Sequence, residues 1–176
     1  IVAMTSRSSW ELLLGWAMLS TQPAQAGQAP LGLPISFGLN AAAALQMAQA
    51  AVSMCEARGY PVVAIITSAE GMTRIQYMSD GAHPIDIESA RRKAATAART
   101  GRATSALAAA AKANGAFASI LTTLMPDSLP VGGGLPILRD MRIVGAIGVG
   151  GAPGADLDED CARVGVARMP GLTPGP

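Results

Sequence analysis

The segment Pro61-Val-Val-Ala-Ile-Ile-Thr-Ser-Ala-Glu-Gly71 places a run of β-branched residues directly before a turn. Val62–Thr67 has the composition of a buried strand, and Pro61 suits the start of a strand because proline donates no hydrogen bond to a neighbour. Ser68–Gly71 supplies a turn that ends in glycine. Thr73–Met78 is therefore predicted to return as the second strand of a hairpin.

A second hairpin is predicted towards the C-terminal end, where residues 135–138 and 143–149 are joined across Arg139-Asp-Met-Arg142. Apolar periodicity and capping residues predict four helices around the two hairpins. They cover residues 41–58, 85–100, 104–114 and a last helix from Asp156 or Asp158 to Met169. This order predicts an α+β fold, in which helices flank one antiparallel sheet.

The N-terminal residues have the pattern of an export signal. Arg7 supplies a positive charge, Trp10–Leu19 is almost wholly apolar, and Ala24-Gln-Ala26 is a small-x-small cleavage site. The apolar run is shorter than the roughly 20 residues of a membrane span, so no stable membrane anchor is predicted. The alternative is an N-terminal arm. The export interpretation predicts a periplasmic or secreted protein.

The chain divides into four predicted parts. They are a signal peptide (1–26), a Pro/Gly-rich linker or arm (27–39), one domain (40–169) and a frayed tail (170–176).

Composition indicates how the domain is stabilised. Hydrophobic residues make up 50% of the chain, but it contains only two Phe, two Tyr and two Trp. A core built from small side chains buries little area per residue, so subunit contacts, and hence a homo-oligomer, are expected. The formal net charge is +1, and no basic run with interleaved aromatic residues is present. This composition excludes a typical nucleic-acid surface.

Five sequence blocks, in this order, resemble the GlcG/HbpS family of small haem-binding proteins, whose domain also forms the C-terminal part of PduO-type proteins. The blocks are Pro61–Gly71, Ser79-Asp-Gly-Ala82, Glu88–Ala98, Gly132-Gly-Gly-Leu-Pro-Ile137, and Val144–Ala152 followed by Asp158-Glu159. The resemblance implies a profilin-like fold, with a five-stranded antiparallel sheet flanked by helices, and haem as cofactor. Four strands are already placed, so the fifth is predicted within residues 117–132.

His83, the only histidine of the chain, is the candidate metal ligand. It follows the Asp80-Gly81 turn, and histidine is a common axial ligand of haem iron. The alternative is a solvated loop histidine. Met72 and Met78 are candidate soft ligands or pocket walls, with ordinary packing as the alternative.

Four basic residues are candidates for pairing with haem propionates, because guanidinium and ammonium groups bind carboxylates. They are Arg74, Arg91, Arg92 and Lys93. Lys93 lies in one of the blocks that carry the resemblance. The alternative for the helical members is an ordinary solvated helix face. The haem site is accordingly expected near the Asp80–Pro84 turn and the helix that follows.

Cys55 and Cys161 are too far apart in sequence for a Cys-x-x-Cys motif. The implied fold allows a disulfide between the first and last helices, but buried free thiols are the favoured prediction. The acidic stretch 156–160 lacks the ligand pattern of a calcium loop, so charge at a helix N-terminus explains it better.

No hydrolase or transferase motif is present, and the glycines of Gly145-Ala-Ile-Gly148 lack the spacing of a dinucleotide loop. The favoured function is therefore haem binding without a catalytic constellation. The first alternative is a cofactor-free oligomerisation or docking module, which the scarcity of aromatic residues favours. The second alternative is an enzyme acting on a small molecule, for which the sequence offers no acid/base pair.

Overall fold

The computed structural model describes residues 38–176, so the predicted signal peptide and almost all of the linker lie outside the described residues. The elements in chain order are α1 (Ala41–Glu56), β1 (Val63–Thr67), β2 (Thr73–Met78), α2 (Pro84–Thr100), α3 (Thr104–Ala113), α4 (Gly115–Leu124), β3 (Gly134–Arg139), β4 (Arg142–Gly150), α5 (Ala155–Ala167) and β5 (Thr173–Pro174). None of the helices in residues 38–176 is long and apolar enough to cross a membrane.

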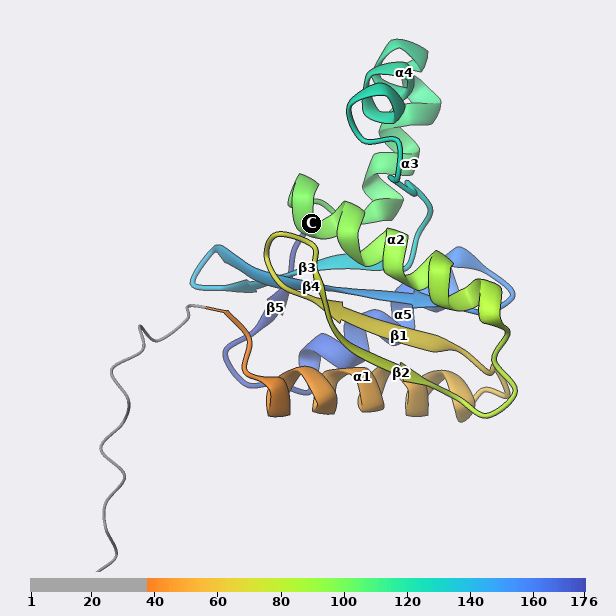
Figure 1. Cartoon of the computed structure of the whole chain (residues 1–176), viewed down its shortest axis with the longest axis vertical. Coiled ribbons are helices and arrows are strands. Elements are labelled where there is room, and N and C mark those ends of the chain that lie inside the picture. The colour runs from red at the N-terminus through yellow and green to blue at the C-terminus, as the bar shows by residue number, and fades with distance from the viewer. Residues whose placement is uncertain (1–37) are drawn as a thin grey trace, which may run out of the picture. The chain divides into compact units, whose positions relative to one another are not determined.

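The strands form one five-stranded antiparallel sheet in the order β2-β1-β4-β3-β5 (Figure 1). Both predicted hairpins are present, as β1–β2 and β3–β4. The α+β class and the five-stranded sheet flanked by helices are therefore confirmed.

The fifth strand is not where the sequence predicted it. Residues 115–124 form α4, because the Asn114 side chain accepts hydrogen bonds from the amides of Ala116 and Phe117 and caps a helix there. The fifth strand, β5, instead lies in the tail that was expected to fray. The Gly175 amide donates to the Pro136 carbonyl at 2.8 Å, which ties the tail to β3.

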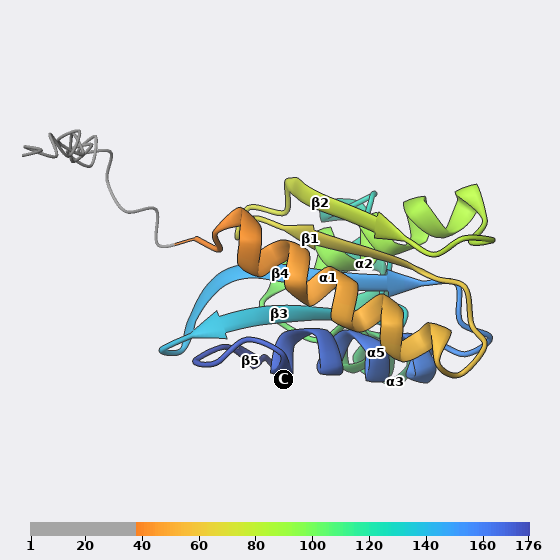
Figure 2. The same cartoon turned by 90° about the horizontal axis from the view of Figure 1, so that it is seen from below.

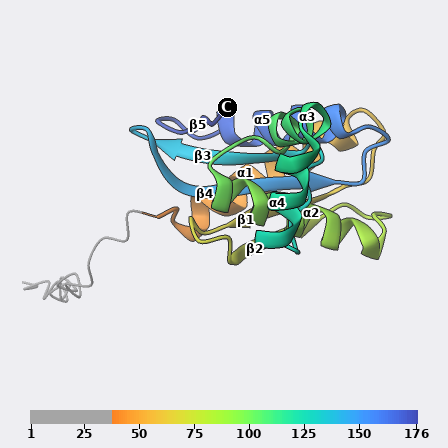
Figure 3. The same cartoon turned by 90° about the horizontal axis from the view of Figure 1, so that it is seen from above.

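Helices cover both faces of the sheet. On one face α1 and α5 pack over Ala64, Ile66 and Ile147 to make the main core (Figure 2). On the other face α2 packs over Val63 and Ile65 through its alanines (Figure 3). The uninterrupted burial of β1 follows from this arrangement, since both sets of its alternating side chains are covered.

Small residues set the distance between the layers. A Cβ atom on Gly148 of β4 would overlap the backbone of α2 at Ala90 and Ala94. A Cβ atom on Gly165 of α5 would come within 2.7 Å of the Met47 carbonyl oxygen of α1. Helix α2 therefore lies closer to β4, and α5 closer to α1, than a side chain at either glycine would permit. This close packing compensates for the scarcity of large apolar residues.

Cys55 of α1 and Cys161 of α5 form a disulfide with a Cα–Cα distance of 5.8 Å, and both residues are fully buried. The prediction of free thiols is therefore wrong. The two helices pack side by side on one face of the sheet, which brings the cysteines within bonding distance although 106 residues separate them in sequence.

We expect this disulfide to contribute substantially to stability, because a bond that closes so long a loop strongly restricts the unfolded chain. Replacing both cysteines (Cys55→Ala and Cys161→Ala) should lower the free energy of unfolding by about 2–5 kcal/mol. Urea denaturation of the full chain measures the change. An unfolding midpoint equal to that of the unreduced parent protein would contradict the expectation.

Candidate functional site

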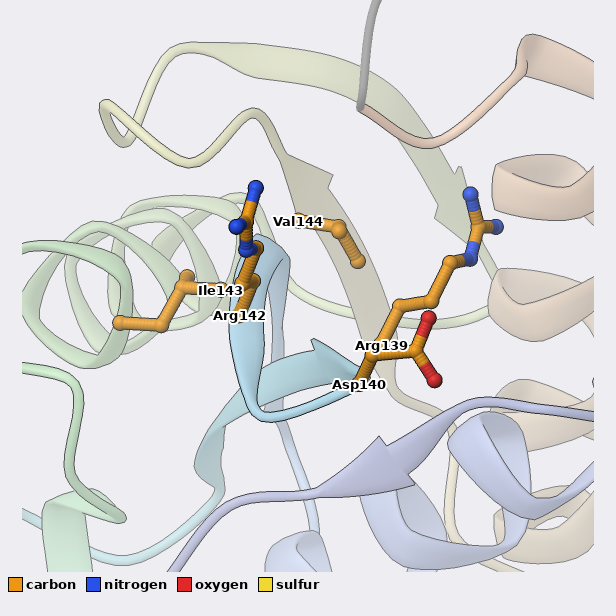
Figure 4. A pocket seen from close by; sticks show the side chains of 5 residues that line it. All are labelled: Arg139, Asp140, Arg142, Ile143 and Val144. Carbon is orange, nitrogen blue, oxygen red and sulfur yellow. The ribbon is translucent and has the colours of Figure 1, made fainter.

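Two hairpin turns lie at the same end of the sheet, and a hollow of about 490 Å³ opens beside the β3–β4 turn. Arg139, Asp140, Arg142, Ile143 and Val144 line it. In the view of Figure 4, Arg139 and Asp140 extend to one side of the turn, Ile143 extends to the other, and Arg142 points upward between them. The hollow thus combines two guanidinium groups and the Asp140 carboxylate with two aliphatic side chains.

A second hollow of about 360 Å³ lies next to the first and shares Ile143 and Val144 with it. Its other walls come from Gly38, which precedes α1, and from the β1–β2 hairpin, where Ser68, Glu70 and Arg74 line it. The structure therefore brings Arg74, which the sequence analysis selected, close to Arg139 and Arg142, which it did not.

Three arginines and two carboxylates, those of Asp140 and Glu70, line the two hollows, so cations outnumber anions there by one. Among the described residues, neither Arg74, Arg139 nor Arg142 forms an ion pair within 4.0 Å of a carboxylate. Guanidinium groups bind carboxylates and other planar anions through two parallel hydrogen bonds. The two hollows can therefore accept a ligand that has an apolar body and acidic groups at its edge.

The turn between β3 and β4 has an uncommon backbone. Asp140 and Met141 both have positive φ angles, of 49° and 63°, and the Met141 side chain is 87% exposed. A tight turn with two left-handed residues fits the twist of a hairpin, and such turns usually contain asparagine or glycine. This geometry sets Arg139 and Arg142 directly opposite each other on neighbouring strands.

His83 lies at the opposite end of the sheet. It immediately precedes α2, is exposed, and its backbone amide donates to the Asp86 carboxylate at 3.0 Å. Arg74 lies near the start of β2, whereas His83 comes five residues after Met78, the last residue of that strand. One copy of the chain therefore separates these two predicted site residues by the length of the strand.

The arginines of α2 have partners within the protein. The Arg92 guanidinium donates to the carbonyl oxygens of Asp127 and Ser128 at 3.1 and 2.9 Å, and Arg91 donates to the Asp127 carboxylate at 2.9 Å. Both arginines hold the loop between α4 and β3 against α2. They are positioned as structural links rather than as free anion receptors.

Lys93 is buried, and its ammonium group donates to the Asp158 carboxylate at 2.7 Å and to the Val149 carbonyl at 3.1 Å. The two charged side chains are only 4% and 5% exposed. The Asp158 carboxylate also accepts a hydrogen bond from the Ala152 amide. Burial raises the pKa of Asp158, and Lys93 opposes that rise. The Lys93 ammonium group is therefore buried against Asp158 and is not available at the surface to pair with a propionate.

The other sequence-selected side chains are dispersed. Met72 and Met78 are 71% and 40% exposed on the β1–β2 hairpin, so neither lies in the core. Asp156 and Asp158 occupy the first turn of α5, as expected from the helix dipole. Within residues 38–176 no group of three His, Cys, Asp or Glu side chains could hold a metal ion.

Arg139 and Arg142 were not predicted as site residues, because their sequence pattern indicates only the turn of a hairpin. A signal was available, since two arginines flank a two-residue turn and both are expected at the end of the sheet. Which other residues meet them there depends on strand order, and the local sequence does not reveal strand order.

Comparison with known proteins places these features in context. A family model described as haem-degrading protein, HbpS-like, matches residues 39–167. A solved structure of a double mutant of Streptomyces reticuli HbpS is 36% identical, with a TM-score of 0.70 over 78% of this chain and 91% of that chain. None of the curated proteins matches the chain.

Two further solved structures share the fold. A complex of PduOC with heme is 26% identical and has a TM-score of 0.70, covering 76% of this chain and 96% of that chain. The Klebsiella pneumoniae protein ORFY is 24% identical, with a TM-score of 0.69 over 74% of this chain and 89% of that chain.

Removing the Lys93 charge tests its structural role. Lys93→Met leaves Asp158 buried without a counter-charge, so the free energy of unfolding at pH 7 should fall by about 3–5 kcal/mol. The folded-state pKa of Asp158 then lies further above its unfolded value. Because a raised pKa favours the folded state at low pH, stability should recover as the pH falls from 7 to 5. Urea denaturation at both pH values measures this.

The matched control for that experiment is the double variant Lys93→Met with Asp158→Asn, which removes both charges. Its unfolding free energy should show little dependence on pH between 5 and 7 and should exceed that of Lys93→Met at pH 7. Equal stability of Lys93→Met and the parent protein would show that the ion pair has no net structural role.

Proposed function

This chain belongs to the family of HbpS-like haem-degrading proteins, and on that premise we propose that it binds haem or a related planar tetrapyrrole. The observation that carries the proposal is the pair of adjoining hollows, in which Arg74, Arg139 and Arg142 surround Ile143 and Val144. The heme complex of PduOC, a relative with the same fold, supports the same ligand class.

The residues present fit the chemistry of haem. Its two propionates require cations, which Arg139 and Arg142 provide, and its ring requires an apolar surface, which the partly exposed Ile143 provides beside the largely buried Val144. Arg74 adds a third cation at the neighbouring hollow. These groups would bind and orient the ligand, and bound haem would supply any redox chemistry.

His83, the only imidazole of the chain, is exposed, but in the same copy it lies at the opposite end of the sheet from the two hollows, so it does not reach a haem bound in them. Lys93 is reassigned from propionate pairing to the buried ion pair with Asp158. Arg92 is likewise reassigned to the loop that follows α4. The proposed haem site of this chain thus keeps Arg74 and gains Arg139 and Arg142.

The competing function is a cofactor-free oligomerisation or docking module. The observation that favours it is the outer side of α4, where Ile120 and Leu124 are 56% and 76% exposed. Exposed apolar side chains on a helix are typical of a protein–protein contact. Haem titration separates the two candidates, since a docking module would not bind the cofactor saturably.

Haemin added to the purified full chain should give a saturable Soret band. In the double variant Arg139→Ala with Arg142→Ala, the dissociation constant should rise about five-fold for each arginine, since exposed ion pairs contribute about 1 kcal/mol. Lys112→Ala, an exposed change in the last turn of α3, is the matched control and should bind like the parent. An unsaturable spectrum with the parent protein would refute haem binding.

We also propose that the protein is exported to the periplasm or secreted. The Cys55–Cys161 disulfide supports this, because structural disulfides persist mainly in oxidising compartments. The support is independent of Arg7 and Ala24-Gln-Ala26, on which the predicted signal peptide rests.

Export can be tested in a Gram-negative host that expresses the chain with its N-terminal residues intact. The periplasmic fraction should contain a protein beginning at Gly27, as measured by intact-mass spectrometry. Ala24→Asp with Ala26→Asp should abolish this processing, because the cleavage site requires small residues. Finding only unprocessed cytoplasmic protein from the parent chain would rule the proposal out.

A further inference from the structure

One end of the sheet gathers exposed arginines from elements that are distant in sequence. The β1–β2 turn, the β3–β4 turn and the C-terminal ends of α2 and α5 all lie there (Figure 2). A Cβ atom on Gly71 would come within 3.3 Å of the Arg99 guanidinium, and one on Gly101 would come within 3.0 Å of Ile143. We call this the basic end, and its exposed arginines are Arg74, Arg99, Arg102, Arg139, Arg142 and Arg168.

The charges of the basic end are not neutralised within the protein. Among residues 38–176, none of its arginines forms an ion pair within 4.0 Å. The acidic side chains that lie here are Glu70 and Asp140. The Pro176 carbonyl accepts a hydrogen bond from the Ala103 amide at 2.6 Å, so a terminal carboxylate adds a third negative charge. Cations therefore outnumber anions at this end.

The opposite end of the domain has the reverse charge. Helix α1 ends there, and α2 and α5 begin there (Figure 2). Arg58 and Lys93 are both neutralised by ion pairs at this end. Its acidic residues are Glu56, Asp80, Asp86, Asp156, Asp158, Glu159 and Asp160. The domain is thus polarised along its strands, although the formal net charge of the chain is only +1, and an anionic partner would orient it with the basic end forward.

Each hairpin turn of the basic end also carries an exposed methionine. Met72 in the β1–β2 turn is 71% exposed, and Met141 in the β3–β4 turn is 87% exposed. Met141 lies in sequence between Asp140 and Arg142, at the tip of its hairpin. Flexible apolar side chains surrounded by guanidinium groups suit the interface of a lipid bilayer, where the charges meet phosphates and the apolar groups meet the acyl boundary.

Helix dipoles account for only part of this arrangement. Arg99 lies in the last turn of α2 and Arg168 caps α5, and at both places a positive charge complements the dipole. Arg74, Arg139 and Arg142 lie on strands, where no such dipole exists. A dipole also gives no reason for an apolar side chain at the tip of each turn.

The polypeptide enters the domain at the basic end as well. Gly38, the first residue described, lines the same hollow as Arg74. Residues 27–37, which lead to it, contain no charged side chain and include Leu31, Leu33 and Ile35. The segment that joins the domain here therefore brings no negative charge to this end.

We propose that the basic end docks reversibly onto an anionic phospholipid bilayer, with Met72 and Met141 entering the headgroup layer and the arginines pairing with lipid phosphates. Guanidinium groups bind phosphate through parallel hydrogen bonds. A bilayer fits better than nucleic acid, because bases stack on aromatic side chains and neither turn has one; the aromatic residues of 38–176 are Tyr60, Tyr77 and Phe117. The contact is peripheral, with no helix of residues 38–176 crossing the membrane.

Sedimentation with lipid vesicles tests the docking. The full chain should bind vesicles of phosphatidylcholine with about one-third phosphatidylglycerol in about 0.1 M salt. It should be released in about 1 M salt, because the screening length falls from about 10 Å to about 3 Å. Vesicles of phosphatidylcholine alone should bind little protein. Equal binding to both kinds of vesicle, or binding that salt does not weaken, would overturn the proposal.

Charge variants test whether the basic end makes the contact. Arg102→Gln with Arg168→Gln should weaken vesicle binding about five-fold for each arginine, since a basic residue near an anionic surface contributes about 1 kcal/mol. The matched control, Arg58→Gln with Lys112→Gln, removes two positive charges elsewhere and should bind like the parent. All four side chains are exposed, and circular dichroism checks that both variants fold. Equal losses in the two variants would contradict docking through the basic end.

A polarity-sensitive dye locates the contact. Met141→Cys provides a single reactive thiol, because the native cysteines are bonded to each other. Its dye should shift to shorter wavelength on anionic vesicles, whereas a dye on Leu124→Cys, a position 76% exposed on α4, should not. Vesicle binding without a shift at residue 141, or a DNA duplex bound as tightly as the vesicles, would assign the basic end to anions in general and refute the lipid contact.

Docking would also bring the two hollows to the membrane, a consequence that rests on the proposed haem function. Haem has an apolar ring and dissolves in lipid, so the parent should take haemin from loaded anionic vesicles. Arg102→Gln with Arg168→Gln should take it about as much more slowly as its vesicle binding is weaker, yet bind free haemin like the parent, because neither residue lines a hollow. Transfer at the parent's rate would refute this consequence. Failure of the parent to bind free haemin would instead refute the proposed function and leave the vesicle result standing.

Discussion

The buried ion pair between Lys93 and Asp158 connects the two helical layers of the fold. Lys93 belongs to α2 on one face of the sheet, and Asp158 belongs to α5 on the other face. They meet at the end of the sheet where the chain enters β3, and a Cβ atom on Gly133 would collide with both side chains. Two charges so completely withdrawn from water are tolerated only when each satisfies the other, so this contact ties α2 to α5.

The sequence predicted the parts of the structure that depend on local patterns and missed those that depend on contacts between distant residues, such as this ion pair. Both hairpins and four helices follow from local patterns, such as the β-branched run of β1 and the glycine that ends α2. Lys93 was misassigned to the ligand because a lysine within a helix has the same local signature whether it is exposed or buried. Its partner lies 65 residues away, and only the packed fold shows that the two meet. β5 was missed because a two-residue strand that contains proline has no alternation to detect.

The candidate site shows the same division between local and distant information. The basic residues at this end of the sheet include Arg74, which the sequence selected and which does line a hollow. Their grouping was not predictable, because Arg74 and the β3–β4 turn meet only through the strand order β2-β1-β4-β3. His83 was expected beside Arg74 on the basis of their closeness in sequence. An extended strand separates its two ends, so sequence neighbours along β2 lie at opposite ends of the sheet.

The stability of the core depends on contacts within one copy of the chain. A core of alanine and glycine was expected to need subunit contacts as reinforcement. The structure supplies other reinforcement within one copy, through the Cys55–Cys161 bridge between α1 and α5 and the close approach that Gly165 permits. The core is therefore reinforced within one copy by a covalent bond and by close helix packing, and the exposed residues Gln76, Tyr77 and Met78 of β2 lie outside it.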